Sequence, residues 1–108
     1  MKAEKFGLRD SDLKSIVAFL KKFDNIHQAI LFGSRAKGNY THGSDVDIAI
    51  VGDFDSRDVT KLSYLLNHET MMPYKFDIID YNSIQNPELK EHIDRVGIGI
   101  YSSSKVTG

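Results

Sequence analysis

Residues 30–51 read ILFGSRAKGNYTHGSDVDIAIV, and this stretch decides how the rest of the chain is interpreted. An apolar run enters a polar, glycine-rich turn, and a second apolar run then carries Asp45 and Asp47 two positions apart. Side chains two apart in a strand point to the same face, so these carboxylates are expected to stand side by side. Neighbouring carboxylates repel each other unless a cation lies between them, and ligands that are all oxygen suit Mg²⁺. The stretch therefore predicts a magnesium site on the second strand.

The turn between the two apolar runs supplies groups that bind phosphate. It offers backbone N–H groups at Gly33, the hydroxyl of Ser34 and the fixed positive charge of Arg35. Such groups hold phosphate oxygens by charge-assisted hydrogen bonds. We expect their loss to weaken phosphate binding.

Composition limits the class of protein. A chain of 108 residues with 41% hydrophobic and 27% charged residues is expected to form one soluble domain over 1–108, with a core at about 10–101 and a flexible tail at 102–108. A net charge of −1 argues against direct nucleic-acid binding. The chain has no cysteine and no apolar run of bilayer-spanning length, so we expect a cytoplasmic protein that does not enter a membrane.

Hydrophobic periodicity and turn residues give the expected elements. Helices are predicted at 10–22, from Ser56 to about 72 and from Pro87 to 96, and strands at 28–32, 45–51, 75–81 and 98–101. Residues 33–44 are predicted to be a loop. This order indicates an α+β fold with a mixed or antiparallel sheet of about four strands and with helices packed on one side.

A third carboxylate is expected on a neighbouring strand, and the chain offers Asp77 and Asp80. The two have opposite parity in a strand, so only one of them can join the cluster. Asp77 is favoured because its face also carries Ile79 and Tyr81, whereas Asp80 lies nearer the strand end, where water is available.

Gly33-Ser34, the spacing of ten residues to Asp45-x-Asp47 and the later strand Asp together resemble the DNA-polymerase-β-like nucleotidyltransferase superfamily. The small size resembles its minimal members (MNT), the antitoxin partners of HEPN-domain toxins. The resemblance covers about residues 10–101. It implies a mixed sheet with flanking helices and Mg²⁺-dependent transfer of a nucleoside monophosphate to a hydroxyl. Within the minimal group it implies transfer of AMP from ATP to a tyrosine of a partner HEPN toxin, within a possible hetero-oligomer.

Carried over residue by residue, the resemblance assigns two groups of residues. Asp45, Asp47 and Asp77 would hold two Mg²⁺ ions, and Asp77 would also help to deprotonate the acceptor hydroxyl. The expected nucleotide contacts are Gly33, Ser34, Arg35, Lys37 and Ser44. Lys37 stands where the family commonly has arginine, which keeps the charge but gives up bidentate geometry.

Two other functions stay open at this point. The chain could be a catalytically silent nucleotide-binding module that neutralises a partner by contact alone. It could also modify a small molecule such as an aminoglycoside, although 108 residues leave no room for a separate acceptor-binding domain.

Overall fold

A four-stranded mixed sheet organises the computed structural model, which describes residues 2–103 of the chain. The strands are β1 (Ile26–Phe32), β2 (Val46–Gly52), β3 (Phe76–Asp80) and β4 (Ile98–Ser102), in the spatial order β3-β2-β1-β4. β1 is antiparallel to both β2 and β4, whereas β2 and β3 run parallel. The parallel pair brings the starts of β2 and β3, and with them Asp47 and Asp77, to the same end of the sheet.

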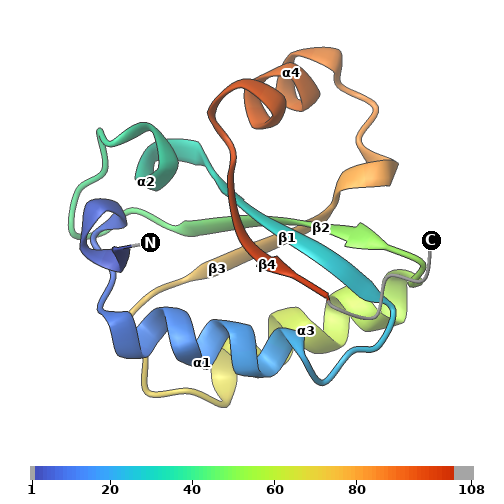
Figure 1. Cartoon of the computed structure of the whole chain (residues 1–108), viewed down its shortest axis with the longest axis horizontal. Helices are drawn as coiled ribbons and strands as arrows, with labels where there is room; N and C mark the ends of the chain where they lie inside the picture. Colours follow the sequence, from blue (N-terminus) through green and yellow to red (C-terminus); the bar gives the residue numbers. More distant parts are fainter. Residues whose placement is uncertain (1, 104–108) are drawn as a thin grey trace.

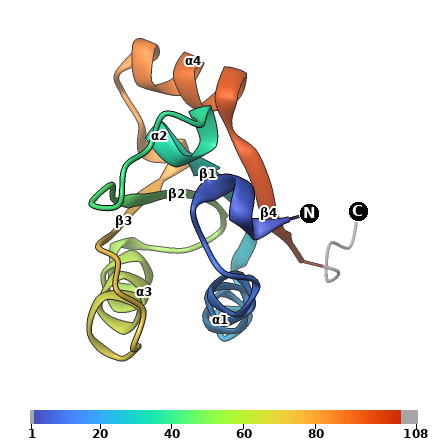
Figure 2. The ribbon, with the colours of Figure 1, turned by 90° about the vertical axis from the view of Figure 1, so that its left-hand side faces the viewer.

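One face of the sheet is covered by α1 (Asp10–Leu20) and α3 (Ser56–His68), which lie side by side in Figure 2. Alternate residues of β2, namely Val46, Ile48 and Ile50, point to this face and are fully buried. They form the main core with apolar side chains of the two helices. This alternation follows the sequence pattern, because a strand with one buried face places an apolar residue at every second position.

The opposite face carries the short helix α2 (Gly33–Lys37) and α4 (Pro87–Val96), which stand above the sheet in Figure 1. Ile93 of α4 packs on Phe32 and Ala49 in a second, smaller core. The expectation that the helices pack on one side is therefore wrong. Helices cover both faces, because the connections after β1 and β3 lead to the face that α1 and α3 leave open.

The sequence also missed three short elements. Residues 33–37 form α2 rather than loop, and Ala3–Phe6 form a 3₁₀ helix, η1, before α1. A second 3₁₀ helix, η2 (Tyr81–Ser83), follows β3. The predicted tail at 102–108 falls mostly outside the described residues, although Ser102 still belongs to β4.

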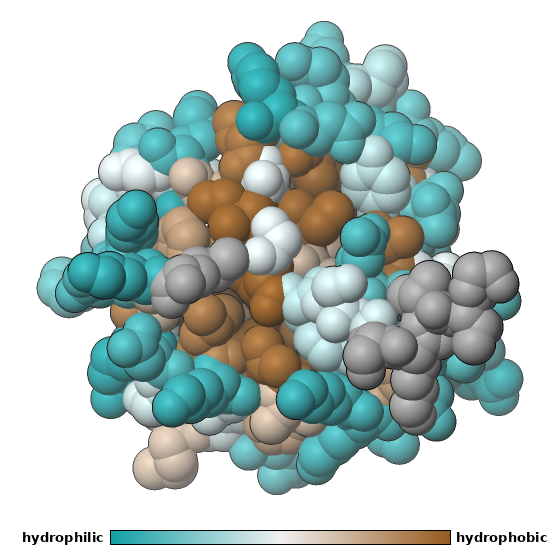
Figure 3. Space-filling view, in the orientation of Figure 1, coloured by the Kyte–Doolittle hydropathy of each residue, from teal (hydrophilic) through white to brown (hydrophobic). Residues whose placement is uncertain are grey.

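Apolar surface gathers around β4 between α4 and α1 in the view of Figure 3. An open groove of about 600 Å³ lies there, lined in part by Ile100 of β4 and by Leu13, Val17 and Ala18 of α1. Among residues 2–103, no helix is both long and apolar enough to cross a membrane.

Candidate active site

Asp47 occupies the centre of the predicted site because β2 lies between β1 and β3. Its Cα pairs with that of Phe32 on β1 and with that of Asp77 on β3. Residues paired across adjacent strands carry their side chains on the same face. The side chains of Asp47 and Asp77 therefore lie side by side on the face that α2 and α4 share, which agrees with the preference for Asp77 over Asp80.

Gly33 brings the turn that is predicted to bind phosphate directly against this carboxylate. It has a φ of 74°, in the left-handed region that glycine adopts without strain. A Cβ at this position would overlap the Oδ2 atom of Asp47. Glycine is therefore required here twice over, for its backbone angle and for the space that the carboxylate takes. The turn and the aspartate form one continuous surface.

Asp45 lies immediately before β2 and completes an acidic group around Asp47. Burial and the negative charges of Asp77 and Asp45 raise the pKa of Asp47 to about 6, and the positive charge of Arg35 opposes them only in part. Asp47 is half-buried, so water screens these charges incompletely. A proton or a metal cation would relieve the repulsion.

The donor chemistry of these carboxylates fits Mg²⁺, which prefers oxygen ligands and usually binds one or two protein carboxylates. The carboxylates do not yet form a complete set of metal ligands. Within residues 2–103, no three His, Cys, Asp or Glu side chains converge to form a ready metal cluster. The backbone register thus brings the acidic side chains together, and rotation about their side-chain bonds would have to complete a shell.

Arg35, which the sequence predicts to contact the phosphates of a nucleotide, has most of its donors already bonded within the protein. Its side chain is only 2% exposed and donates hydrogen bonds to three backbone carbonyls, those of Phe6, Gly7 and Ser44. Most of its N–H groups are therefore already used within the protein. In this structure Arg35 stabilises the backbone at Phe6, Gly7 and Ser44 and acts on Asp47 only through its positive charge.

The remaining expected nucleotide contacts divide into two kinds. Ser34 is half-buried in the first turn of α2 and Lys37 is exposed at its end, so both belong to the element that begins at Gly33. Ser44 instead organises the loop before β2: its Oγ accepts a hydrogen bond from the backbone N–H of Thr41 at 2.9 Å.

Asp80 lies apart from the acidic group, as its parity requires. Its carboxylate accepts hydrogen bonds from the backbone N–H of Asn82 at 3.0 Å and from the hydroxyl of Ser83 at 2.7 Å. It caps the 3₁₀ helix η2 after β3. This local capping accounts for the second aspartate of the strand.

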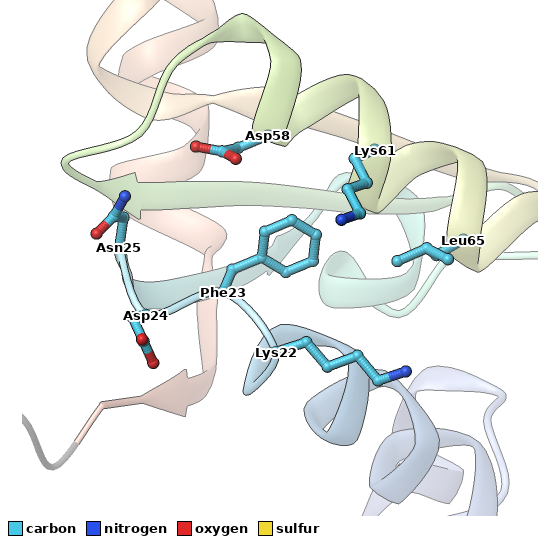
Figure 4. Close-up of a pocket in the computed structure, with 7 residues that line it drawn as sticks. All are labelled: Lys22, Phe23, Asp24, Asn25, Asp58, Lys61 and Leu65. Atoms are coloured by element: carbon cyan, nitrogen blue, oxygen red, sulfur yellow. The ribbon is translucent and has the colours of Figure 1, made fainter.

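A separate cavity of about 480 Å³ opens at the other end of the sheet, between the segment that follows α1 and helix α3 (Figure 4). It is lined by Lys22, Phe23, Asp24, Asn25, Asp58, Lys61 and Leu65. The cavity borders the start of β1 and lies next to the end of β2, where the backbone N–H of Asp53 bonds to the carbonyl of Asn25 at 2.9 Å. The acidic group lies at the start of β2, so the two sites are distinct.

A model of the family described as polymerase beta, nucleotidyltransferase, matches residues 14–106. Two relatives from Methanocaldococcus jannaschii, each described as a putative protein adenylyltransferase, also match. One is 33% identical over 78% of this chain and 90% of its own length. The other is 38% identical over 59% of this chain and 58% of its own length, so this match spans less than two thirds of that relative.

Solved structures share the fold at low sequence identity. A toxin–antitoxin MntA complex, crystallised as a mutant, superposes with a TM-score of 0.69 at 18% identity, over 86% of this chain and 75% of that chain. A tri-AMPylated Shewanella oneidensis HEPN toxin in complex with an MNT antitoxin gives a TM-score of 0.66 at 18% identity, over 88% and 73% of the two chains. A nucleotidyltransferase described from Sulfolobus solfataricus gives 0.57 at 22% identity, over 97% and 91%.

Proposed function

Because this chain belongs to the polymerase beta nucleotidyltransferase family, we propose that it transfers AMP from ATP to a hydroxyl of a partner protein and thereby acts as an antitoxin. The observation that carries the proposal is the position of Asp47. Its carboxylate lies against Gly33 on one side and pairs with Asp77 on the other.

The proposed acceptor is a tyrosine of a HEPN-type toxin. Two relatives are described as putative protein adenylyltransferases, and one structural neighbour is a complex of an MNT antitoxin with a tri-AMPylated HEPN toxin.

Asp45, Asp47 and Asp77 would hold Mg²⁺, with two ions expected. When bound, the metal neutralises phosphate charge and the mutual repulsion of the carboxylates. The backbone N–H groups at Gly33, together with the Ser34 hydroxyl, would hold the triphosphate, and Lys37 would add positive charge at the end of the same helix.

In the proposed reaction the acceptor oxygen attacks the α-phosphorus of ATP in line. A new O–P bond forms, the bond from the α-phosphorus to the bridging oxygen breaks, and pyrophosphate leaves with the bonding electrons. The acceptor proton passes to a carboxylate oxygen of Asp77, the member of the group that is most open to solvent. The chain's main contribution is to hold these groups in line, a form of catalysis that can account for several kcal/mol of the barrier.

The experiment that tests this function follows transfer of label from α-phosphate-labelled ATP to protein in host lysate with Mg²⁺. Asp47→Asn should lower the rate of labelling at least about a hundredfold, because it removes the central carboxylate. Asp53→Asn makes the same change of charge just beyond the far end of β2 and should label at the wild-type rate.

A labelled band that disappears only in Asp47→Asn can be excised to identify the acceptor. Equal labelling by the wild type and Asp47→Asn would contradict the proposal. Neutralisation of the partner that survives Asp47→Asn would instead favour a binding module that acts by contact.

A further inference from the structure

Arg35 forms the most extensive side-chain hydrogen-bond arrangement next to the acidic group. Its Nη1 donates to the carbonyl of Phe6 at 2.9 Å and to that of Gly7 at 3.3 Å. Its Nη2 and Nε both donate to the carbonyl of Ser44, at 2.9 and 3.2 Å. A planar guanidinium can join these two chain segments in this way because its donors form a rigid fork.

Two tyrosine rings hold this guanidinium in place. Its carbon lies 5.0 Å from the ring centre of Tyr74 and 5.4 Å from that of Tyr40, both within the range of cation–π attraction. Tyr74 is fixed in turn by a hydrogen bond of 2.6 Å from its hydroxyl to Asp12. The position of the Arg35 side chain is therefore fixed from several sides. An arginine whose task is to contact phosphate would not need its side chain fixed in this way.

The bonds of Arg35 connect the two halves of the candidate active site. Arg35 lies two residues after Gly33, on the helix that begins against Asp47. The carbonyl that receives two of its bonds belongs to Ser44, the residue before Asp45. Any shift of the guanidinium is thus transmitted to the segment that delivers Asp45 and Asp47.

The geometry points to Arg35 as a positioning residue that, together with the N-terminal segment Ala3–Gly7, sets the placement of Asp45 and Asp47 relative to Gly33. This inference rests on the proposed nucleotidyl transfer for its kinetic consequences. Arg35 thus positions the aspartates instead of binding phosphate. The N-terminal 3₁₀ helix takes part in catalysis indirectly, because it contributes no group to the acidic cluster.

Gly7 offers a way to disturb Arg35 without changing any charged residue. Its φ is 72°, and a Cβ there would lie 2.6 Å from Nη1 of Arg35 and 2.5 Å from Cε2 of Tyr40. A cavity of about 370 Å³, lined in part by Tyr40 and Tyr74, gives these side chains room to move. We therefore expect Gly7→Ala to fold with a displaced guanidinium.

Gly38→Ala is the matched control. Gly38 also has a positive φ, of 93°, so alanine there carries comparable backbone strain, but no atom lies within 4 Å of the added Cβ. The difference between the two variants isolates the contact with Arg35 and Tyr40 from left-handed strain. Thermal unfolding of both variants would confirm that each is folded at the assay temperature.

The test measures the initial rate of labelling as ATP is varied with acceptor held constant. For Gly7→Ala we expect the apparent kcat to fall about tenfold or more, since small displacements of catalytic groups are costly, while KM for ATP stays within about twofold. Gly38→Ala should keep the wild-type kcat. Arg35→Lys retains the charge but loses the fork, and should behave like Gly7→Ala. Equal kcat values for Gly7→Ala and Gly38→Ala would overturn the inference, as would a rise in KM for ATP with kcat unchanged.

Amide hydrogen exchange tests the same connection without relying on activity. Exchange at residues 44–47 should be at least about threefold faster in Gly7→Ala than in Gly38→Ala, because the Ser44 carbonyl loses its anchor. Unchanged exchange would overturn the connection. Faster exchange in a protein whose wild type transfers no label would instead retain the connection and reject the proposed function.

Discussion

Asp12 and Asp47 are both buried at least in part, but their carboxylates lie in opposite electrostatic environments. Asp12 is 2% exposed and bonds to the side chain and backbone N–H of Arg9 and to the hydroxyl of Tyr74. Burial alone would raise its pKa, but these bonds outweigh burial and hold the pKa below its usual value. Asp47 instead faces two like charges, and its pKa rises to about 6.

In Asp12 the ionised carboxylate stabilises the folded protein, whereas in Asp47 it destabilises it. Each partner of Asp12 favours its charged form, so the ionised group contributes to stability. For Asp47, burial and two neighbours disfavour that form, so ionisation costs free energy. Perturbed carboxylates of the second kind cluster at functional sites, where a ligand supplies the missing charge. The three predictions below test this contrast, beginning with the largest expected effect.

Activity should distinguish the acidic group from other aspartates on the same strand. We expect Asp77→Asn to lower the labelling rate about a hundredfold, because Asp77 pairs with Asp47 and is proposed to accept the acceptor proton. Asp80→Asn should stay within about twofold of wild type, since Asp80 only caps η2. Measured rates in which Asp80→Asn is the slower variant would reverse the assignment and contradict the register argument.

Stability should respond most strongly at Asp12. Asp12→Ala removes the acceptor of Arg9 and Tyr74, and we expect the free energy of unfolding to fall by about 2 kcal/mol. Asp10→Ala, in the first turn of the same helix but exposed, should cost about 0.5 kcal/mol through the helix dipole. Urea unfolding monitored by circular dichroism measures both. Comparable losses in the two variants would mean that the bonds of Asp12 add little to a general helix effect.

The sequence predicted the acidic group better than its surroundings. Period-two alternation allowed only one of Asp77 and Asp80 on the face of Asp47, and the strand register places Asp77 there, as favoured from its neighbours in the strand, while its role in catalysis stays a prediction. The pattern works here because parity in a strand depends only on local geometry.

Other features could not be found in the same way. Helix α2 has five residues and begins at a glycine with positive φ, so it shows no hydrophobic period. The face that α4 covers depends on the path of the chain in space. Arg35 belongs to the turn that is predicted to bind phosphate, yet its partners Phe6 and Gly7 lie 28 or more residues away, and no local pattern connects them.

The smallest effect concerns the stability cost of Asp47 and its dependence on pH. The folded-state pKa of about 6 lies above the value near 3.9 expected in the unfolded chain, so between these values the folded state binds more protons. Stability contributed by the proton is complete below about pH 4 and is lost as the pH rises through 6.

Asparagine resembles the protonated form of Asp47. After allowance for solvent screening of this half-buried group, we expect Asp47→Asn to raise the free energy of unfolding by about 1 kcal/mol at pH 7.5 and to leave it unchanged at pH 4. Urea titrations at the two pH values measure this difference. A variant less stable than wild type at pH 7.5 would show that Asp47 is held by favourable contacts, like Asp12, and would remove the contrast between the two residues.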